Sequence, residues 1–183
     1  MNISILSLQE CINEITINGT SDSIVSIRSM NMPIKEYEDI DLYKKINDSK
    51  VIIETFDDVE RRDKYYKLAS KKQVQNILDW SMDKDNIIVH CTAGVSRSSA
   101  IAYLIACKKL NDHTLAVDYL NFNLHNPNLY VVQLGAILLG NHNIYHYLVN
   151  KIEDYMEKNC MNKSNYLYNA KTVWEANKLN ENS

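Results

Sequence analysis

The residues best suited to chemistry lie in one segment, residues 90–99, which reads HCTAGVSRSS. Within it, Cys91 and Arg97 frame five residues. A cysteine attacks as a thiolate, and the planar guanidinium of an arginine donates two parallel hydrogen bonds to a phosphoryl group, which a lysine cannot do. This pair at this spacing predicts a site that binds a phosphate-like dianion and attacks it through sulfur.

The flanking segments predict that this run is a loop between a strand and a helix. The apolar run 87–89 precedes it, and a longer apolar run, 100–106, follows it. A loop at a helix N-terminus points several backbone N–H groups at one spot, where the helix dipole is positive. These groups and Arg97 should lower the pKa of Cys91 well below its free value of about 8.5. We expect phosphate to bind Arg97 together with Thr92, Ala93, Gly94, Val95 and Ser96.

Three more residues of the segment are expected to support the nucleophile. Gly94 lets the backbone turn towards the anion with no Cβ in the way, and the chain has only 4 glycines. Ser98 lies on the first helical turn, where its hydroxyl can reach the sulfur and stabilise it as a leaving group. His90 is expected to orient the loop by hydrogen bonding rather than to titrate in catalysis. The alternative for Cys91 is a purely structural cysteine, since a lone cysteine is usually a small buried hydrophobe.

The pattern His90-Cys91-x5-Arg97-Ser98 resembles the signature loop of the cysteine-dependent protein tyrosine phosphatase superfamily. The ending Gly-Val-Ser-Arg-Ser is most similar to the dual-specificity branch and its small bacterial relatives, and the resemblance extends over about residues 24–148. It implies a phosphoprotein phosphatase in which Cys91 forms a phosphocysteine that water then hydrolyses. The resemblance implies no metal.

The resemblance also implies an aspartic acid that protonates the leaving group, on a loop that follows a buried strand upstream of the cysteine. Here the β-branched run 51–56 is followed by Asp57 and Asp58. Relatives with such a pair usually use the first, so Asp57 is the first candidate and Asp58 the alternative. An asparagine downstream braces the signature loop in the wider family, and Asn128 is the matching residue.

Composition indicates one ordinary globular domain. The chain has 183 residues, of which 45% are hydrophobic and 23% charged, enough for one buried core. The net charge of -3 and the isoelectric point near 5.9 predict neither a nucleic-acid footprint nor a basic membrane patch. The N-terminus lacks the pattern of a secretory leader, and no apolar run is long enough to span a bilayer.

The 4 cysteines are widely spaced and show no zinc pattern, so we expect no metal and no cofactor. A thiolate enzyme suits a reducing compartment. We therefore expect the protein in the cytoplasm, or delivered into another cell's cytosol.

Hydrophobic periodicity predicts alternating strands and helices. Such an order indicates an α/β fold with a central, mostly parallel sheet of about four to five strands and helices on both faces. The active cysteine and the acid loop would both lie at carboxyl ends of strands, where ligands bind in such folds. Strands are expected over 23–27, 51–56 and 86–90, helices over 7–14, 64–82, 96–111, 114–124 and 129–139, and a helical turn over 42–46.

We expect a single phosphatase-like domain over residues 1–158 and a polar C-terminal extension over 159–183. Apolar residues recur at helical spacing over 144–156. This helix either packs on the core or serves self-association. In the extension, Trp174 is the strong apolar anchor.

The expected substrate is a phosphorylated protein or peptide carrying phosphotyrosine, with phosphoserine and phosphothreonine as further candidates. The five loop residues between Cys91 and Arg97 carry no charge. Phosphoinositide phosphatases usually place lysines there, and RNA 5′-triphosphatases show basic residues along their path. The uncharged loop therefore disfavours both non-protein substrates, which we keep as alternatives. A further alternative is a catalytically idle phosphopeptide-binding module.

Overall fold

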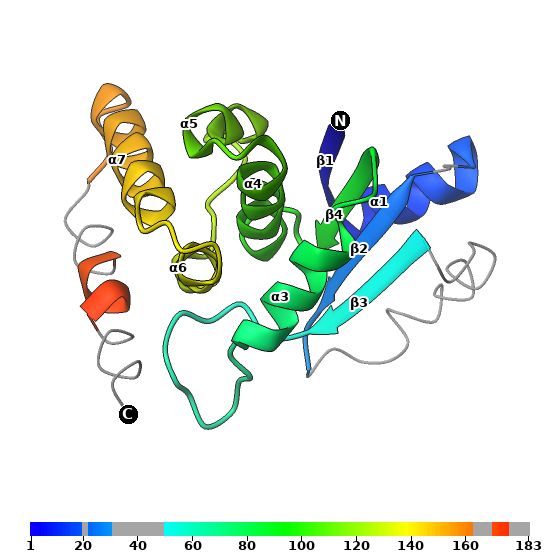
Figure 1. Ribbon diagram of the computed structural model, residues 1–183, viewed down its shortest axis with the longest axis horizontal. Coiled ribbons are helices and arrows are strands. Elements are labelled where there is room, and N and C mark those ends of the chain that lie inside the picture. The colour runs from blue at the N-terminus through cyan, green and yellow to red at the C-terminus, as the bar shows by residue number, and fades with distance from the viewer. Residues whose placement is uncertain (20–21, 31–49, 163–169, 176–183) are drawn as a thin grey trace.

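A four-stranded parallel sheet forms the centre of the computed structural model, which describes residues 1–19, 22–30, 50–162 and 170–175 (Figure 1). The strand order is β1-β4-β2-β3. This confirms the expected α/β class. The strands are β1 (Asn2–Ser7), β2 (Ser23–Arg28), β3 (Val51–Thr55) and β4 (Asn86–Cys91).

The register brings the carboxyl ends of all four strands to one edge of the sheet. Cys91, the last residue of β4, pairs with Ser7, the last residue of β1. Arg28 at the end of β2 pairs with Thr55 at the end of β3. The segments that follow the four strands therefore meet at this edge, where parallel α/β sheets bind their ligands.

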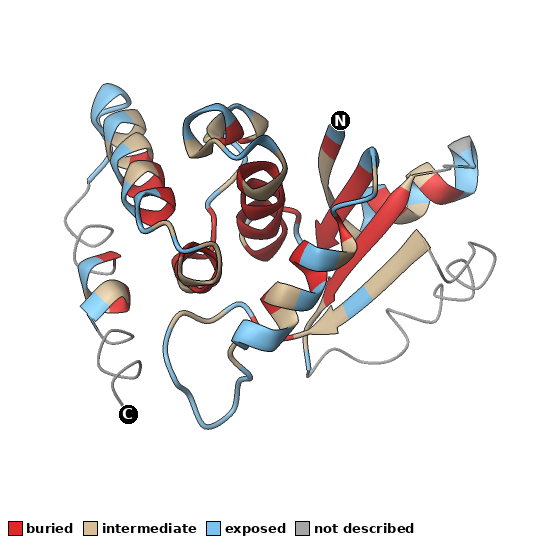
Figure 2. Ribbon diagram, viewed as in Figure 1, coloured by how far each residue is buried: buried red, intermediate tan, exposed pale blue. Residues whose placement is uncertain are grey.

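Helices cover both faces of the sheet, as expected. On one face, α1 (Leu8–Asn13) and the π-helical turn η1 (Glu14–Asn18) bury Cys11 and Ile15 against β2 and β4. The other face carries α3 (Lys71–Trp80) and α4 (Arg97–Leu110), and α6 (Leu129–Leu138) and α7 (Asn143–Lys158) lie beyond α4 (Figure 1). Eleven consecutive residues of α4, Arg97 to Cys107, are buried, which makes this helix the centre of the core (Figure 2).

Strand β1 was not predicted from the sequence. Its alternating pattern, NISILS, is short, and its place at the sheet edge depends on pairing with β4, which lies about eighty residues further along the chain. The helix expected from residue 64 begins only at Lys71, after the N-cap Ser70. Residues 64–70 are irregular because the Lys67 carbonyl accepts Asp57 N–H, and Lys67 N–H donates to the Asp57 carboxylate, in place of partners in a helical turn.

The helix expected over 114–124 is also shorter than predicted. It consists of α5 (His113–Ala116), capped by the Asp112 carboxylate, and a 3₁₀ turn, η4 (Val117–Tyr119). A turn then follows, in which His125 N–H donates to the Asn121 carbonyl. The turn expected over 42–46 lies outside the described residues.

Part of the C-terminal extension packs on the helices. Residues 170–175 are helical, and Ala170 and Val173 are buried. The Gln133 side chain on α6 donates to the Trp174 carbonyl at 3.1 Å, and the Tyr145 hydroxyl on α7 donates to the Ala170 carbonyl at 2.8 Å. Within the described ranges, no helix is both long and apolar enough to cross a membrane.

Candidate active site

The segment between β4 and α4 forms a tight loop, residues 92–96, against the corner between β1 and α1. Gly94 has φ +75°, which side-chain-bearing residues rarely adopt. A Cβ at this position would lie 2.6 Å from the Ser7 backbone nitrogen and 2.8 Å from the Leu6 carbonyl carbon. Leu8 N–H, at the start of α1, donates to the Thr92 carbonyl at 3.2 Å, so the junction between β1 and α1 supports this loop.

Cys91 ends β4 immediately before the loop, and its side chain lies next to Ser98. The residue is buried, and its Sγ lies 3.3 Å from the Ser98 hydroxyl oxygen. Burial by itself raises the pKa of the Cys91 thiol. Hydrogen bonds from the Ser98 side chain and backbone, the Arg97 charge and the Gly94 N–H together outweigh burial and lower this pKa below its usual range.

A second buried cysteine on the same helix–strand unit shows what the loop contributes. Cys107 lies near the end of α4, and burial raises the pKa of its thiol to about 12. The two cysteines are buried to a similar degree. The opposite directions of their pKa shifts therefore come from the donors and the positive charge around Cys91.

Arg97 is held by three hydrogen bonds through its two terminal nitrogens, and its Nε–H lacks a partner among the described residues. Its Nη1 donates to the Ser29 hydroxyl at 2.8 Å and to the Phe56 carbonyl at 2.9 Å, and its Nη2 donates to the Thr92 hydroxyl at 3.2 Å. The Nε atom is buried. A buried guanidinium N–H without an acceptor is costly, and a phosphoryl oxygen next to this N–H would satisfy it.

His90 lies behind the loop and is uncharged at neutral pH. It is buried, and its Nδ1 lies 3.4 Å from the Cys91 carbonyl oxygen. Burial, together with the positive charge of Arg28, lowers the pKa of His90 to about 4. This fits the expectation that the ring orients the loop rather than titrating.

The two candidate acids occupy different environments. Asp57 is buried, and its two carboxylate oxygens accept the backbone N–H groups of Met30 at 3.0 Å and Lys67 at 2.8 Å. Asp58 is exposed and lines the pocket above Cys91, whereas Asp57 is absent from the described residues that line it. The geometry therefore runs against our first candidate, because the Asp57 carboxylate is occupied with holding the backbone.

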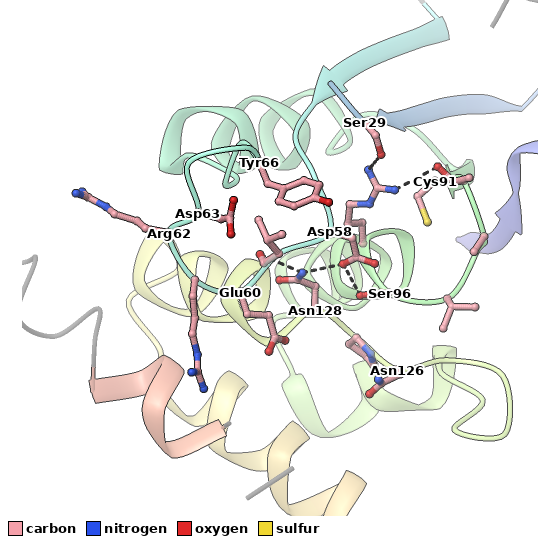
Figure 3. A pocket seen from close by; sticks show the side chains of 17 residues that line it. Ser29, Asp58, Glu60, Arg62, Asp63, Tyr66, Cys91, Ser96, Asn126 and Asn128 are labelled. Carbon is pink, nitrogen blue, oxygen red and sulfur yellow. Dashed lines mark hydrogen bonds between the residues drawn. The ribbon is translucent and has the colours of Figure 1, made fainter. Parts of the chain in front are cut away.

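Asp58 faces the signature loop. Its Oδ1 accepts the Ser96 hydroxyl at 2.7 Å and the Asn128 side-chain amide at 2.9 Å (Figure 3). Asn128 also caps α6, since its Oδ1 accepts Val131 N–H at 3.0 Å, and its own N–H donates to the Ser96 carbonyl at 3.2 Å. Asn128 thus joins the acid loop to the signature loop, in keeping with its expected bracing role.

These loops surround one pocket of about 1220 Å³ at the carboxyl edge of the sheet (Figure 3). The signature loop forms its floor, and residues 58–63 with Tyr66 form one wall. Residues 126–128 close another side.

Comparison with protein-family models and with curated proteins finds no match. Solved structures do match. The Cydia pomonella PTP-2 phosphatase is 16% identical, covers 73% of this chain and 83% of its own, and superposes with a TM-score of 0.52. The chain has the fold of the protein tyrosine phosphatases. Two further matches are PTPMT1 in complex with PI(5)P (8% identity, 82% and 94% coverage, TM-score 0.49) and Tk-PTP in the active form (13%, 83% and 90%, 0.39).

Sequence reasoning missed several residues that line this pocket, among them Ser29, Glu60 and Tyr66. Ser29 follows β2 and accepts from Arg97, Glu60 lies two residues after Asp58, and Tyr66 forms part of the wall. Ser29 and Glu60 were within reach of prediction, because each closely follows a strand at the carboxyl edge. Tyr66 was not, because the sequence placed it inside a helix.

The pocket offers no evident metal site. The described residues contain no group of three or more histidine, cysteine or carboxylate side chains that could hold a metal ion. The chemically active groups that line the pocket include the Cys91 thiol, the Asp58 and Glu60 carboxyls and the guanidinium groups of Arg61, Arg62 and Arg97.

Proposed function

We propose that this protein is a cysteine-dependent phosphatase that hydrolyses phosphotyrosine in proteins or peptides through a phosphocysteine intermediate. The observation that carries the proposal is the Cys91 thiol of lowered pKa beside the unpartnered Nε of Arg97, under an open pocket. A thiolate and a guanidinium are the nucleophile and the anion receptor that phosphoryl transfer needs.

In the first step, the Cys91 thiolate attacks phosphorus and forms the S–P bond while the bond from phosphorus to the tyrosine oxygen breaks. The leaving oxygen takes a proton from the Asp58 carboxyl, so a neutral phenol departs and Asp58 becomes a carboxylate. Arg97 and the loop N–H groups stabilise the equatorial oxygens.

In the second step, water attacks phosphorus and gives one proton to the Asp58 carboxylate. The S–P bond breaks, inorganic phosphate forms, and the Cys91 thiolate is restored. The Ser98 hydroxyl, 3.3 Å from Sγ, donates to the departing sulfur and stabilises its charge.

The choice of Asp58 as the acid rests on exposure and position. Its carboxylate faces the pocket beside Ser96, whereas both oxygens of Asp57 are held by backbone amides. A general acid must reach the leaving oxygen directly or through one water.

Two features of the pocket support a phosphotyrosine substrate. The loop between Cys91 and Arg97 carries no basic side chain, so the basic side chains besides Arg97 among the described residues that line the pocket are Arg61 and Arg62 of the opposite wall, away from the floor. Tyr66 and Val95, an aromatic and an apolar side chain that are both exposed, line the pocket and offer contacts to an aryl group. We also propose that the protein acts in the cytoplasm, because a reducing compartment protects a reactive thiolate from oxidation.

The direct test is phosphate release from a phosphotyrosine peptide, a phosphoserine peptide and a soluble phosphoinositide. We expect the wild type to prefer the phosphotyrosine peptide and Cys91→Ser to release no phosphate while still binding vanadate. Peptide binding by a folded wild type without any turnover would instead identify a binding module. Preference for the phosphoinositide would overturn the substrate assignment.

A second test separates the two aspartates. Asp58→Asn should lower kcat on phenyl phosphate by about 10²–10⁴ and abolish the decline in rate with rising pH, since Asn cannot donate a proton. Asp57→Asn should lower stability and leave that decline in place. The reverse result would restore Asp57 as the acid.

A further inference from the structure

Glu60 ties the acid loop to a helix. It lies two residues after Asp58, and its Oε1 accepts the backbone N–H of Leu129, the first residue of α6, at 2.8 Å. That N–H is one of those at a helix N-terminus that lack a partner within the helix. The Glu60 carboxyl therefore receives a donor at the positive end of the α6 dipole.

The same junction is held from the opposite side. The Asn128 side chain donates to Asp58 Oδ1 at 2.9 Å while its own Oδ1 accepts from Val131. One hydrogen bond thus runs from the α6 cap to the acid loop at Asp58, and the other from the first residue of α6 to the acid loop at Glu60. Two attachments on either side of Val59 fix the direction in which Asp58 points.

Glu60 is also a carboxyl in the pocket wall, which makes it a rival for the role of proton donor. Burial raises the pKa of Glu60, the Leu129 hydrogen bond lowers it, and the neighbouring Asp58 charge raises it again, with a net rise. The neutral form of the side chain still offers an acceptor oxygen to Leu129. The variant Glu60→Gln keeps that acceptor oxygen but cannot donate a carboxyl proton. It therefore distinguishes a role in holding the loop from a role as proton donor.

We propose that Glu60 is a positioning residue, which keeps Asp58 aimed at the leaving oxygen by anchoring the acid loop to the N-terminus of α6. This rests on the proposed function and goes beyond it, because it assigns the geometry of proton transfer to a hydrogen bond between a loop and a helix end. Glu60 itself exchanges no proton with the substrate.

The test uses leaving groups of different acidity. p-Nitrophenolate leaves easily without a proton, whereas phenolate depends on the acid. Glu60→Ala should lower kcat on phenyl phosphate by about 10- to 100-fold and on p-nitrophenyl phosphate by about threefold or less, since misplacing a catalytic group by about 1 Å can cost such factors. Glu60→Gln should recover most of the rate lost on phenyl phosphate.

Two controls sharpen the result. Asp112→Ala removes another carboxylate that caps a helix N-terminus, that of α5, away from the pocket. It should lower stability without any dependence on the leaving group. In an Asp58→Asn background, Glu60→Ala should cause little further loss on phenyl phosphate, because a positioning effect needs the acid that it positions.

Several outcomes would overturn the proposal. Equal losses on both substrates, or full additivity with Asp58→Asn, would reduce Glu60 to general support of the fold. If Glu60→Gln removes the decline in rate with rising pH, then Glu60 is the acid itself. Vanadate binding by each variant verifies the folded site, and a wild type without turnover would refute the proposed function rather than this inference.

Discussion

Cys91 and Cys107 are the same residue type in similarly buried positions, yet the pKa values of their thiols are shifted in opposite directions. Burial raises the pKa of Cys107 to about 12, whereas the donors and charge around Cys91 reverse that effect. The pKa of a buried thiol in this protein is therefore decided by a few polar contacts within hydrogen-bond distance of its sulfur.

Ser98→Ala should raise the pKa of Cys91. A lost hydrogen bond to an anion corresponds to about one pH unit. Since the thiolate is the reactive form, the half-point of Cys91 alkylation should move to higher pH, and activity at the acidic end of the profile should fall. Mass spectrometry of the alkylated Cys91 peptide against pH measures this shift.

Ser99→Ala is the matched control for that measurement. The Ser99 hydroxyl donates to the carbonyls of Val95 and Ser96 instead of to sulfur. If Ser99→Ala moves the alkylation profile as far as Ser98→Ala does, the effect comes from loop geometry and not from the contact with Sγ.

At the scale of elements, the signature loop depends on a strand that the sequence did not reveal. The backbone of Leu6 and Ser7, at the end of β1, fills the space next to Gly94 and leaves no room for a Cβ. The signature loop is therefore shaped by the packing of β1 and α1 as well as by its own residues.

Gly94→Ala should abolish turnover and phosphate binding. Two costs combine, namely a positive φ for a non-glycine residue and the steric clash with Ser7. We expect a fall in kcat/KM of more than about 100-fold, because a loop displaced by about 1 Å can no longer orient the phosphoryl group. Phosphate release and vanadate titration measure the two losses.

Gly140→Ala is the control that carries the cost of a positive φ without the steric clash. Gly140 follows α6 with φ +62°, and nothing lies within 4 Å of its would-be Cβ. This variant should lose about 1–2 kcal/mol of stability from backbone strain alone and retain activity. If Gly94→Ala behaves like Gly140→Ala, the close approach of β1 is not what shapes the loop.

At the scale of the whole molecule, the C-terminal helix belongs to the packing of the domain. The Trp174 ring lies 4.9 Å from the Tyr145 ring and 4.5 Å from the His146 ring between centroids. Tyr145 and Gln133 also hold the backbone of this segment. These contacts attach residues 170–175 of the expected C-terminal extension to α6 and α7.

Trp174→Ala should lower the free energy of unfolding by about 2–4 kcal/mol, because it removes a large aromatic contact from α7. Urea denaturation measures this change. Lys171→Ala is the control, since that exposed side chain makes a long ion pair with Glu175 at 3.9 Å and should contribute little. Unchanged unfolding of Trp174→Ala would show that residues 170–175 contribute nothing to the fold.

The sequence by itself determined the features that are local in the chain. The apolar strand, the Cys91-x5-Arg97 loop and the buried helix α4 are contiguous, so periodicity and residue type predicted the order of the elements from β2 to α4 and the parallel α/β class, but not β1. Strands β2, β3 and β4 were predicted within one residue of their observed ends. The prediction that the loop binds phosphate rests on the same local pattern.

Only the tertiary structure decided which neighbours act on each side chain. Asp57 and Asp58 are adjacent and identical in chemistry, and they differ because Met30 and Lys67 hold one while Ser96 and Asn128 hold the other. The Glu60–Leu129 contact and the packing of β1 against Gly94 likewise join residues far apart in the chain. Such contacts arise from the way the sheet brings its strand ends to one edge, which no local pattern encodes.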